Sequence, residues 1–240
     1  MHKVQEKNSG MRMQRRIAVY GKTPEKAVEL KKELSKHGFI LDDRKPDIVI
    51  SYGGDGTFLA AERNYPEIPK ALFRYSKICK KCHDLPISHA IELLERGKFR
   101  IINYPKIEAK FGKQTLVAAN DVVVRNALPI RAMRFTFSVN GRRIDDEIIG
   151  DGILVATAFG ATGYFYSITR KTFDKGIGIA FNNTTIAHHP IFLKKAKIKL
   201  TVTRGTGLVG ADNNQRIIKL KPGQSVTITI SRKKTRLIQF

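Results

Sequence analysis

The sequence predicts an α/β N-terminal domain with a parallel sheet, followed by a mainly β, sandwich-like C-terminal domain. Up to about residue 98, short apolar runs that suit buried strands alternate with segments of helical periodicity, the pattern of a parallel sheet covered by helices. Beyond that point, strand-like segments separated by turn residues dominate. We therefore expect an α/β domain over residues 1–98 and a β-rich domain over residues 99–240, with the last residues free to return to the first domain.

In the first domain, an apolar strand over residues 16–20 leads into a helix over residues 24–37. Thr23 suits the N-cap of that helix and Pro24 its first position. The same patterns predict further strands and helices, the strands at residues 47–52 and 70–75 and the helices at residues 57–63 and 88–96.

The second domain is predicted from short strands bounded by turn residues. Asn140-Gly141 is a strong hairpin signal. Periodicity alone does not choose between a sandwich and a barrel. The expected strands span residues 99–102, 107–111, 115–118, 121–125, 133–139, 153–157, 198–203, 217–220 and 225–230.

The composition restricts the class of partner. Lys and Arg number 44 against 21 Asp and Glu, giving a formal net charge of +23, so the chain attracts anions such as nucleic acid, anionic membrane or phosphorylated metabolites. No aromatic RNA-binding motif or recognition helix is recognisable, so no specific nucleic acid is expected. No apolar run approaches a membrane span, and the amino end lacks the apolar core of a signal peptide, so we expect a cytoplasmic protein with no membrane partner.

Cys79 and Cys82 are the two cysteines of the chain, and His83 follows them. The spacing is compatible with half a zinc site, a redox pair or haem attachment, but also with two ordinary thiols in a loop. Because a zinc site needs further ligands and haem attachment needs export, we interpret them as ordinary thiols and predict no metal held by protein side chains.

The most informative segment is Gly53-Gly54-Asp55-Gly56-Thr57, placed between a predicted strand and a predicted helix. Its glycines would allow positive φ angles and close approach to a ligand. The free amides at the start of the helix suit phosphate. A carboxylate beside phosphates suits the deprotonation of an attacking hydroxyl, so the segment indicates phosphoryl transfer with Asp55 at the reacting centre.

The chain resembles the NAD kinase family, whose members carry GGDGT after a strand, then an Asn-Glu pair, then a glycine-rich TPTGSTAY-like segment after Asp-Gly. The order and approximate spacing of these elements agree from about residue 16 onward. Asp121 stands in place of the Glu of the pair, and the third element is less similar. The matching residues are Gly53–Thr57, Asn120-Asp121, Asp151-Gly152 and Thr157–Ser167.

This resemblance implies an enzyme that phosphorylates the adenosine 2′-hydroxyl of NAD to give NADP. It implies ATP or polyphosphate as donor, Mg²⁺ or another divalent cation as cofactor, and a homodimer or homotetramer. Asp55 would be the general base, with Gly54, Gly56 and Thr57 beside the phosphates. Arg131, and also Lys22, are candidates for offsetting the charge of the transferred group.

The resemblance also implies residues for the dinucleotide. Asn120 and Asp121 would bind the adenosine half, and Asp151 the nicotinamide half. Gln215 would belong to a late Asp-Gly-Gln element, read here as residues 212–215. The wall beside adenine and ribose would consist of Thr162, Gly163, Tyr164 and Ser167.

Three other functions remain open from the residues alone. A lipid or diacylglycerol-type kinase shares GGDGT, and the elements at residues 120–121 and 157–167 distinguish it. A nucleotide-binding regulator without turnover would bind NAD or NADP and form no product. A basic nucleic-acid-binding module would rest on the net charge alone.

Overall fold

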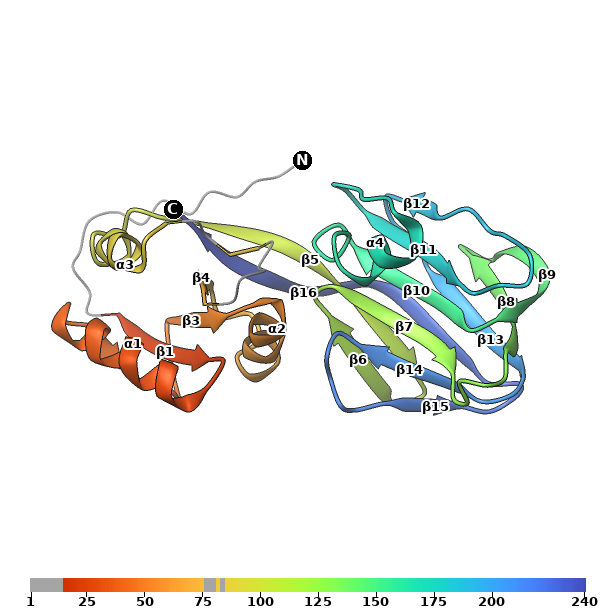
Figure 1. Cartoon of the computed structure of the whole chain (residues 1–240). Coiled ribbons are helices and arrows are strands. Elements are labelled where there is room, and N and C mark those ends of the chain that lie inside the picture. The colour runs from red at the N-terminus through yellow and green to blue at the C-terminus, as the bar shows by residue number, and fades with distance from the viewer. Residues whose placement is uncertain (1–14, 76–80, 83–84) are drawn as a thin grey trace. The chain divides into compact units, whose positions relative to one another are not determined.

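The computed structural model describes residues 15–75, 81–82 and 85–240. The chain divides into two compact units, Met1–Tyr104 with Lys234–Phe240 and Pro105–Lys233. Strands β5 (Arg100–Phe111) and β16 (Ser225–Gln239) each contribute residues to both units (Figure 1). The first unit is α/β and the second mainly β, so the predicted fold class is confirmed.

The first unit is built on parallel strands in the order β2-β1-β3-β4, and the end of β16 pairs in parallel with β4. Consecutive strand residues point to opposite faces of a sheet. Here Ile17 and Ile50 face α1 and α3, whereas Ala18 faces α2. The elements are β1 Arg16–Gly21, α1 Pro24–Lys36, β2 Ile40–Leu41, β3 Ile48–Gly53, α2 Asp55–Asn64, β4 Lys70–Arg74 and α3 Ile87–Glu95.

The second unit contains two antiparallel sheets. One has the order β12-β11-β10-β7-β14-β15, and in the other β16, β13, β8 and β9 follow one another while β5 pairs with β16 and β6. Apolar residues of both sheets, such as Val124 of β7 and Phe135 of β8, belong to one core, as in a sandwich. The elements are β6 Gln114–Ala118, β7 Asp121–Asn126, β8 Met133–Val139, β9 Arg142–Gly150, β10 Gly152–Thr157, α4 Tyr164–Thr169, β11 Ile177–Asn182, β12 Ile191–Leu193, β13 Ile198–Arg204, β14 Gly207–Ala211 and β15 Ile218–Leu220.

Several elements differ from their predicted extent. The strands expected at residues 99–102 and 107–111 are one strand, β5, which continues through Pro105. The last strand runs to Gln239 instead of ending at residue 230, because exposed basic residues occupy its middle without interrupting the pairing. Elements that the sequence pattern did not predict are β2, β9, β11, β12, β14 and α4.

Cys79 and His83 lie outside the described residues. Cys82 is disulfide-bonded, and the described residues contain no free cysteine, so the interpretation of the two cysteines as ordinary thiols is wrong. Within residues 15–75, 81–82 and 85–240, no helix is long and apolar enough to cross a membrane.

Candidate functional site

The glycine turn joins β3 to α2. β3 ends at Gly53, Gly54 caps the helix, and α2 begins at Asp55, two residues before the predicted start. The Asp55 carboxylate therefore lies in the first turn of a helix, at the positive end of the helix dipole and beside amides that have no partner within the helix. Asp55 is half-buried, while Gly56 is exposed. This placement suits both an anionic ligand and an acid–base group.

The glycines of this turn act differently from the prediction. None of the three has a positive φ angle, and Gly54 is extended with a φ of −124°. The expectation of left-handed backbone here is wrong. Gly53 is required for space instead, because a Cβ at that position would lie 2.2 Å from the Thr57 Oγ1 atom. The Thr57 side chain thus lies directly over the backbone that ends β3.

The other end of α2 is fixed by a buried ion pair that the sequence reasoning missed. The Lys70 Nζ atom lies 2.7 Å from the Glu62 Oε2 atom, and the two side chains are 0% and 4% exposed. The Lys70 ammonium also donates to the carbonyl oxygens of Tyr65 and Ile68. The signal in the sequence that could have indicated this ion pair is a lysine at the start of an apolar strand. The pair links α2 to β4 and so helps to orient the helix that carries Asp55.

In the second unit, the turn at Asn120-Asp121 is held by Asp212. The Asp212 carboxylate accepts hydrogen bonds from the backbone N–H groups of Ala119, Asn120 and Asp121, at 2.8, 2.8 and 3.2 Å. The Asp212 N–H donates in return to the Asp121 carbonyl oxygen. Asp212 belongs to the late element in which Gln215 was the predicted binding residue. Gln215 itself is exposed in the loop between β14 and β15.

The segment after β10 packs on the same turn. The Thr157 hydroxyl donates to the Ala119 carbonyl oxygen at 2.6 Å, and the Thr157 N–H donates to the Asn120 carbonyl oxygen at 2.8 Å. Gly160 lies so close that a Cβ there would be 2.3 Å from the Asn120 carbonyl oxygen. The structure therefore brings together three segments that are distant in sequence. They are the turn at Asn120-Asp121, the segment Thr157–Gly160 after β10, and the loop that contains Asp212.

The predicted wall follows immediately. Gly163 caps α4, and the Ser167 hydroxyl donates to the Gly163 carbonyl oxygen at 3.3 Å. Phe165 points into the unit, and Tyr164 is 40% exposed with its hydroxyl 3.5 Å from the Asn182 Nδ2 atom. Thr162 is exposed. Residues 162–167 thus present polar and aromatic groups next to the turn at Asn120.

Asp151 lies at the opposite end of β10. Asp121 pairs with Ala156, whereas Gly152 pairs with Arg125. The distance along the strand from Ala156 to Asp151 is about 17 Å at the usual rise per residue. Within one chain the structure does not bring Asp151 to Asp121. Arg131 is exposed at this end, and its carbonyl oxygen accepts from the Asn126 side chain.

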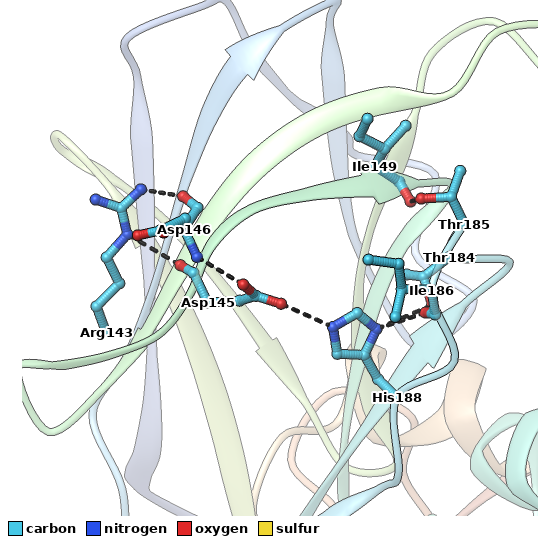
Figure 2. A network of polar contacts seen from close by, with 8 residues as sticks. All are labelled: Arg143, Asp145, Asp146, Ile149, Thr184, Thr185, Ile186 and His188. Carbon is cyan, nitrogen blue, oxygen red and sulfur yellow. Dashed lines mark hydrogen bonds and ion pairs between the residues drawn. The ribbon is translucent and has the colours of Figure 1, made fainter.

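A polar network joins the loop after β11 to β9 (Figure 2). The His188 Nε2 atom lies 3.2 Å from the Asp145 carboxylate, and its Nδ1 atom lies 2.8 Å from the Ile186 carbonyl oxygen. Thr185 donates its N–H to the Ile149 carbonyl oxygen at 2.9 Å. Hydrogen bonding to His188 holds the pKa of the Asp145 carboxyl below its usual value. The network fixes the loop that follows Asn182.

Comparisons with known proteins agree on one family. No family model matches the chain. A curated NAD kinase of Sulfurisphaera tokodaii is 29% identical over 94% of this chain and 95% of its own length. A curated NAD kinase of Clostridium beijerinckii is 27% identical over 81% of this chain and 73% of its own length.

Solved structures share the fold. The structure of an NAD kinase from Archaeoglobus fulgidus in complex with ATP has a TM-score of 0.78 at 18% identity and covers 93% of both chains. Yeast NADH kinase complexed with NADH has a TM-score of 0.81 at 14% identity and covers 94% of this chain and 83% of its own. The chain thus has the two-unit fold of these solved structures. In sequence it is similar to NAD kinases along nearly its whole length.

Proposed function

We propose that the protein transfers the γ-phosphoryl group of ATP to the adenosine 2′-hydroxyl of NAD, giving NADP and ADP, with Asp55 as the general base. The observation that carries this proposal is the placement of Asp55 in the first turn of α2, directly after β3. Relatives named NAD kinase along nearly the whole chain support the activity. The solved relative that holds ATP supports this donor, and polyphosphate remains an alternative donor.

The chemistry follows from the groups at the glycine turn. The Asp55 carboxylate accepts the proton of the 2′-hydroxyl while the ribose oxygen forms a bond to the γ-phosphorus. The bond from that phosphorus to the β–γ bridging oxygen breaks, and ADP leaves. The amides at the start of α2, with Gly54, Gly56 and Thr57, stabilise the phosphate oxygens. Lys22 is the candidate cation for the charge of the transferred group, whereas Arg131, the other predicted candidate, lies at the Asp151 end of β10, away from Asp121.

A divalent cation fits these groups only in part. In the described part of the chain, no three His, Cys, Asp or Glu side chains are grouped to hold a metal ion. Mg²⁺ commonly uses one or two carboxylates together with the phosphates of the substrate. Asp55 is the carboxylate that would contribute, and the cation would supply positive charge to the transferred phosphoryl group.

The dinucleotide is proposed to bind to the second unit. The Asp121 carboxylate would accept hydrogen bonds from ribose hydroxyls, and Asn120 would bind the adenosine half. Tyr164 is exposed for stacking, beside Thr162, Gly163 and Ser167. The hydrogen bonds from Asp212 and Thr157 fix the turn against which this half would bind. Asp151 would bind the nicotinamide half, and Gln215 stays a candidate without a defined contact.

Two further properties belong to the proposal. We propose a homodimer or homotetramer, because Asp121 and Asp151 lie at opposite ends of β10 and one chain does not bring them to one short site. We also propose a cytoplasmic location, because the substrates NAD and ATP are cytoplasmic metabolites. A lipid or diacylglycerol-type kinase is not favoured, because the relatives are named NAD kinases and the elements at residues 120–121 and 157–167 are present.

A product assay tests the function. The protein is incubated with Mg²⁺, NAD and either ATP or polyphosphate, and NADP is measured, with diacylglycerol as an alternative acceptor in parallel. We expect NADP with ATP and no phosphorylated lipid. Absence of NADP with every donor, while calorimetry shows NAD binding, would indicate a regulator and overturn the kinase activity. Salt-sensitive DNA binding without NAD binding would indicate the nucleic-acid module instead.

A further inference from the structure

The turn that carries Asp151 is tightly packed on both sides. A Cβ at Gly150 would lie 2.8 Å from the Thr184 Cα atom and 2.9 Å from the Asn183 carbonyl oxygen. Gly152 has a φ of +133°, and a Cβ there would lie 1.9 Å from the Val124 carbonyl oxygen. The backbones of β7 and of the loop after β11 therefore approach Asp151 from either side. This packing leaves little freedom to the backbone of Asp151.

β7 and the loop after β11 each contribute one side-chain amide that donates a hydrogen bond to the Asp151 carboxylate. The Asn126 Nδ2 atom lies 3.1 Å from the Asp151 Oδ1 atom, and the Asn183 Nδ2 atom lies 2.8 Å from the Asp151 Oδ2 atom. The two carboxylate oxygens thus have one donor each, from different elements. An ionised carboxylate has about four acceptor positions, so acceptor capacity remains on both oxygens.

Asn126 is itself fixed by its surroundings. Its side chain is 3% exposed, and its Nδ2 atom also lies 2.9 Å from the Leu128 carbonyl oxygen and 2.8 Å from that of Arg131. Its Oδ1 atom is buried and has no hydrogen-bond partner among the described residues. A buried acceptor without a partner costs stability. The two hydrogens of the Nδ2 group are shared among three acceptors, so Asn126 links the Asp151 carboxylate to the loop that contains Leu128 and Arg131.

Asn183 is held in a different way. It has a φ of +46°, in the left-handed region that asparagine tolerates better than most residues. Its side chain reaches Asp151 from an exposed loop, and the contacts of Thr185 and His188 with β9 fix that loop (Figure 2). The amide of Asn183 is thus presented to Asp151 by a segment that is tied to the strand leading into Asp151.

We infer that Asn126 and Asn183 are positioning residues for substrate binding. They orient the Asp151 carboxylate so that its free acceptor positions face a ligand N–H or O–H group, such as the carboxamide or a ribose hydroxyl of the dinucleotide. This inference rests on the proposed function, because Asp151 is a proposed NAD-binding residue. It predicts that the two amides affect NAD affinity through Asp151 and not through the glycine turn.

The test compares NAD binding and kinetics across a small set of variants. For Asn183→Ala we expect the Kd and KM for NAD to rise roughly tenfold, the usual cost of one hydrogen bond to a charged group. The kcat and the KM for ATP should stay within about twofold. Asn103→Ala, at an exposed position of β5, is the matched control and should change neither parameter.

A double-mutant cycle separates positioning from a merely structural role. In an Asp151→Ala background, which has no acceptor for the Asn183 amide, Asn183→Ala should have no further effect on NAD affinity. Additive losses of affinity, or an unchanged Kd in Asn183→Ala, would overturn the inference. Asn126→Asp, which replaces the donor by an acceptor, should weaken NAD binding in the same way. If it does not fold, the exposed Asn183 variant still decides the question.

A failure of this inference can be distinguished from a failure of the proposed kinase activity. Calorimetry with NAD alone reports on the positioning of Asp151 without any turnover. Wild-type protein that forms no NADP would contradict the proposed function, whereas active wild-type protein with an unchanged Asn183→Ala variant would contradict only this inference.

Discussion

The carboxylate of Asp212 accepts a hydrogen bond of 2.8 Å from the backbone N–H of Asn120, across 92 positions of sequence. Asp212 contacts the N–H groups on both sides of Asn120 as well, and its own N–H returns a bond to Asp121. A single acidic side chain therefore fixes the backbone that presents the proposed adenosine-binding residues.

Asp212→Asn should loosen this turn, because an amide offers one acceptor oxygen where the carboxylate offers two. We expect a loss of roughly 1.5–3 kcal/mol in the free energy of unfolding, the range for hydrogen bonds to charged groups. The Kd for NAD should rise as well. Urea unfolding and calorimetry measure the two effects. Asp174→Asn, at an exposed position, is the control, and equal behaviour of the two variants would contradict the role of Asp212.

Gly160→Ala should disturb the same turn by steric contact. The new Cβ would lie 2.3 Å from the Asn120 carbonyl oxygen, so Asn120 or the loop after β10 must move. We expect a loss of about 1–3 kcal/mol in the free energy of unfolding, as for overpacked sites. In Gly210→Ala the Cβ would meet nothing closer than 3.4 Å, so that variant should be tolerated. Equal melting temperatures would contradict the close approach at Gly160.

Lys70→Met should destabilise the first unit strongly. It leaves the Glu62 carboxylate buried without its cation, which costs about 3–5 kcal/mol in comparable pairs. The double variant Glu62→Leu with Lys70→Met removes both charges and should recover most of that loss. Denaturant unfolding of the three proteins provides the comparison. A Lys70→Met protein as stable as wild type would show that the ion pair between Lys70 and Glu62, with its N–O distance of 2.7 Å, does not stabilise α2.

His188→Phe should raise the pKa of the Asp145 carboxyl towards its ordinary value of 3.8. The hydrogen bond to His188 is the main cause of the lowered pKa, with smaller contributions from the Asp146 N–H and from Arg143. Since the folded pKa is lowered, the stabilisation is present above the ordinary value and is lost as pH falls through the folded pKa.

Carboxyl NMR titration measures this pKa directly. Phenylalanine keeps a ring that can stack on Phe181, as His188 does, but it cannot donate a hydrogen bond. His189→Phe, at the exposed neighbouring position, should leave the titration of Asp145 unchanged. An unaltered titration in His188→Phe would show that the contact of 3.2 Å is not maintained in solution.

Much of the fold was predictable because apolar runs in the sequence mark its buried strands. The apolar runs of β1 and β3, and the glycine turn between β3 and α2, are local signals. β9 escaped prediction because the first six of its residues are exposed and mostly charged or polar. β14 contains two glycines in five residues, which weakens its strand pattern. The pairing of β9 and β14 depends on strands that neighbour them in the sheets, and a short stretch of sequence does not contain this information.

The candidate site was predictable only in part for the same reason. Asp55 and Asn120 stand in short motifs, so the sequence identifies them. The residues that fix the site act across long separations, as Asp212 does on Asn120 and as Lys70 does on α2. Asn126 and Asn183 meet at Asp151 only through strand pairing. No spacing along the chain reveals such contacts.

The most direct measurement is NADP formation by the Asp55→Asn protein, made with NAD, ATP and Mg²⁺ in excess and with NAD binding checked by calorimetry. The variant keeps the shape of the side chain and loses its ability to accept a proton. We expect kcat to fall by roughly 10²- to 10⁴-fold, the share that general base catalysis commonly contributes, while the Kd for NAD stays within a few-fold of wild type. Wild-type turnover by Asp55→Asn would contradict the assignment of Asp55 as the base.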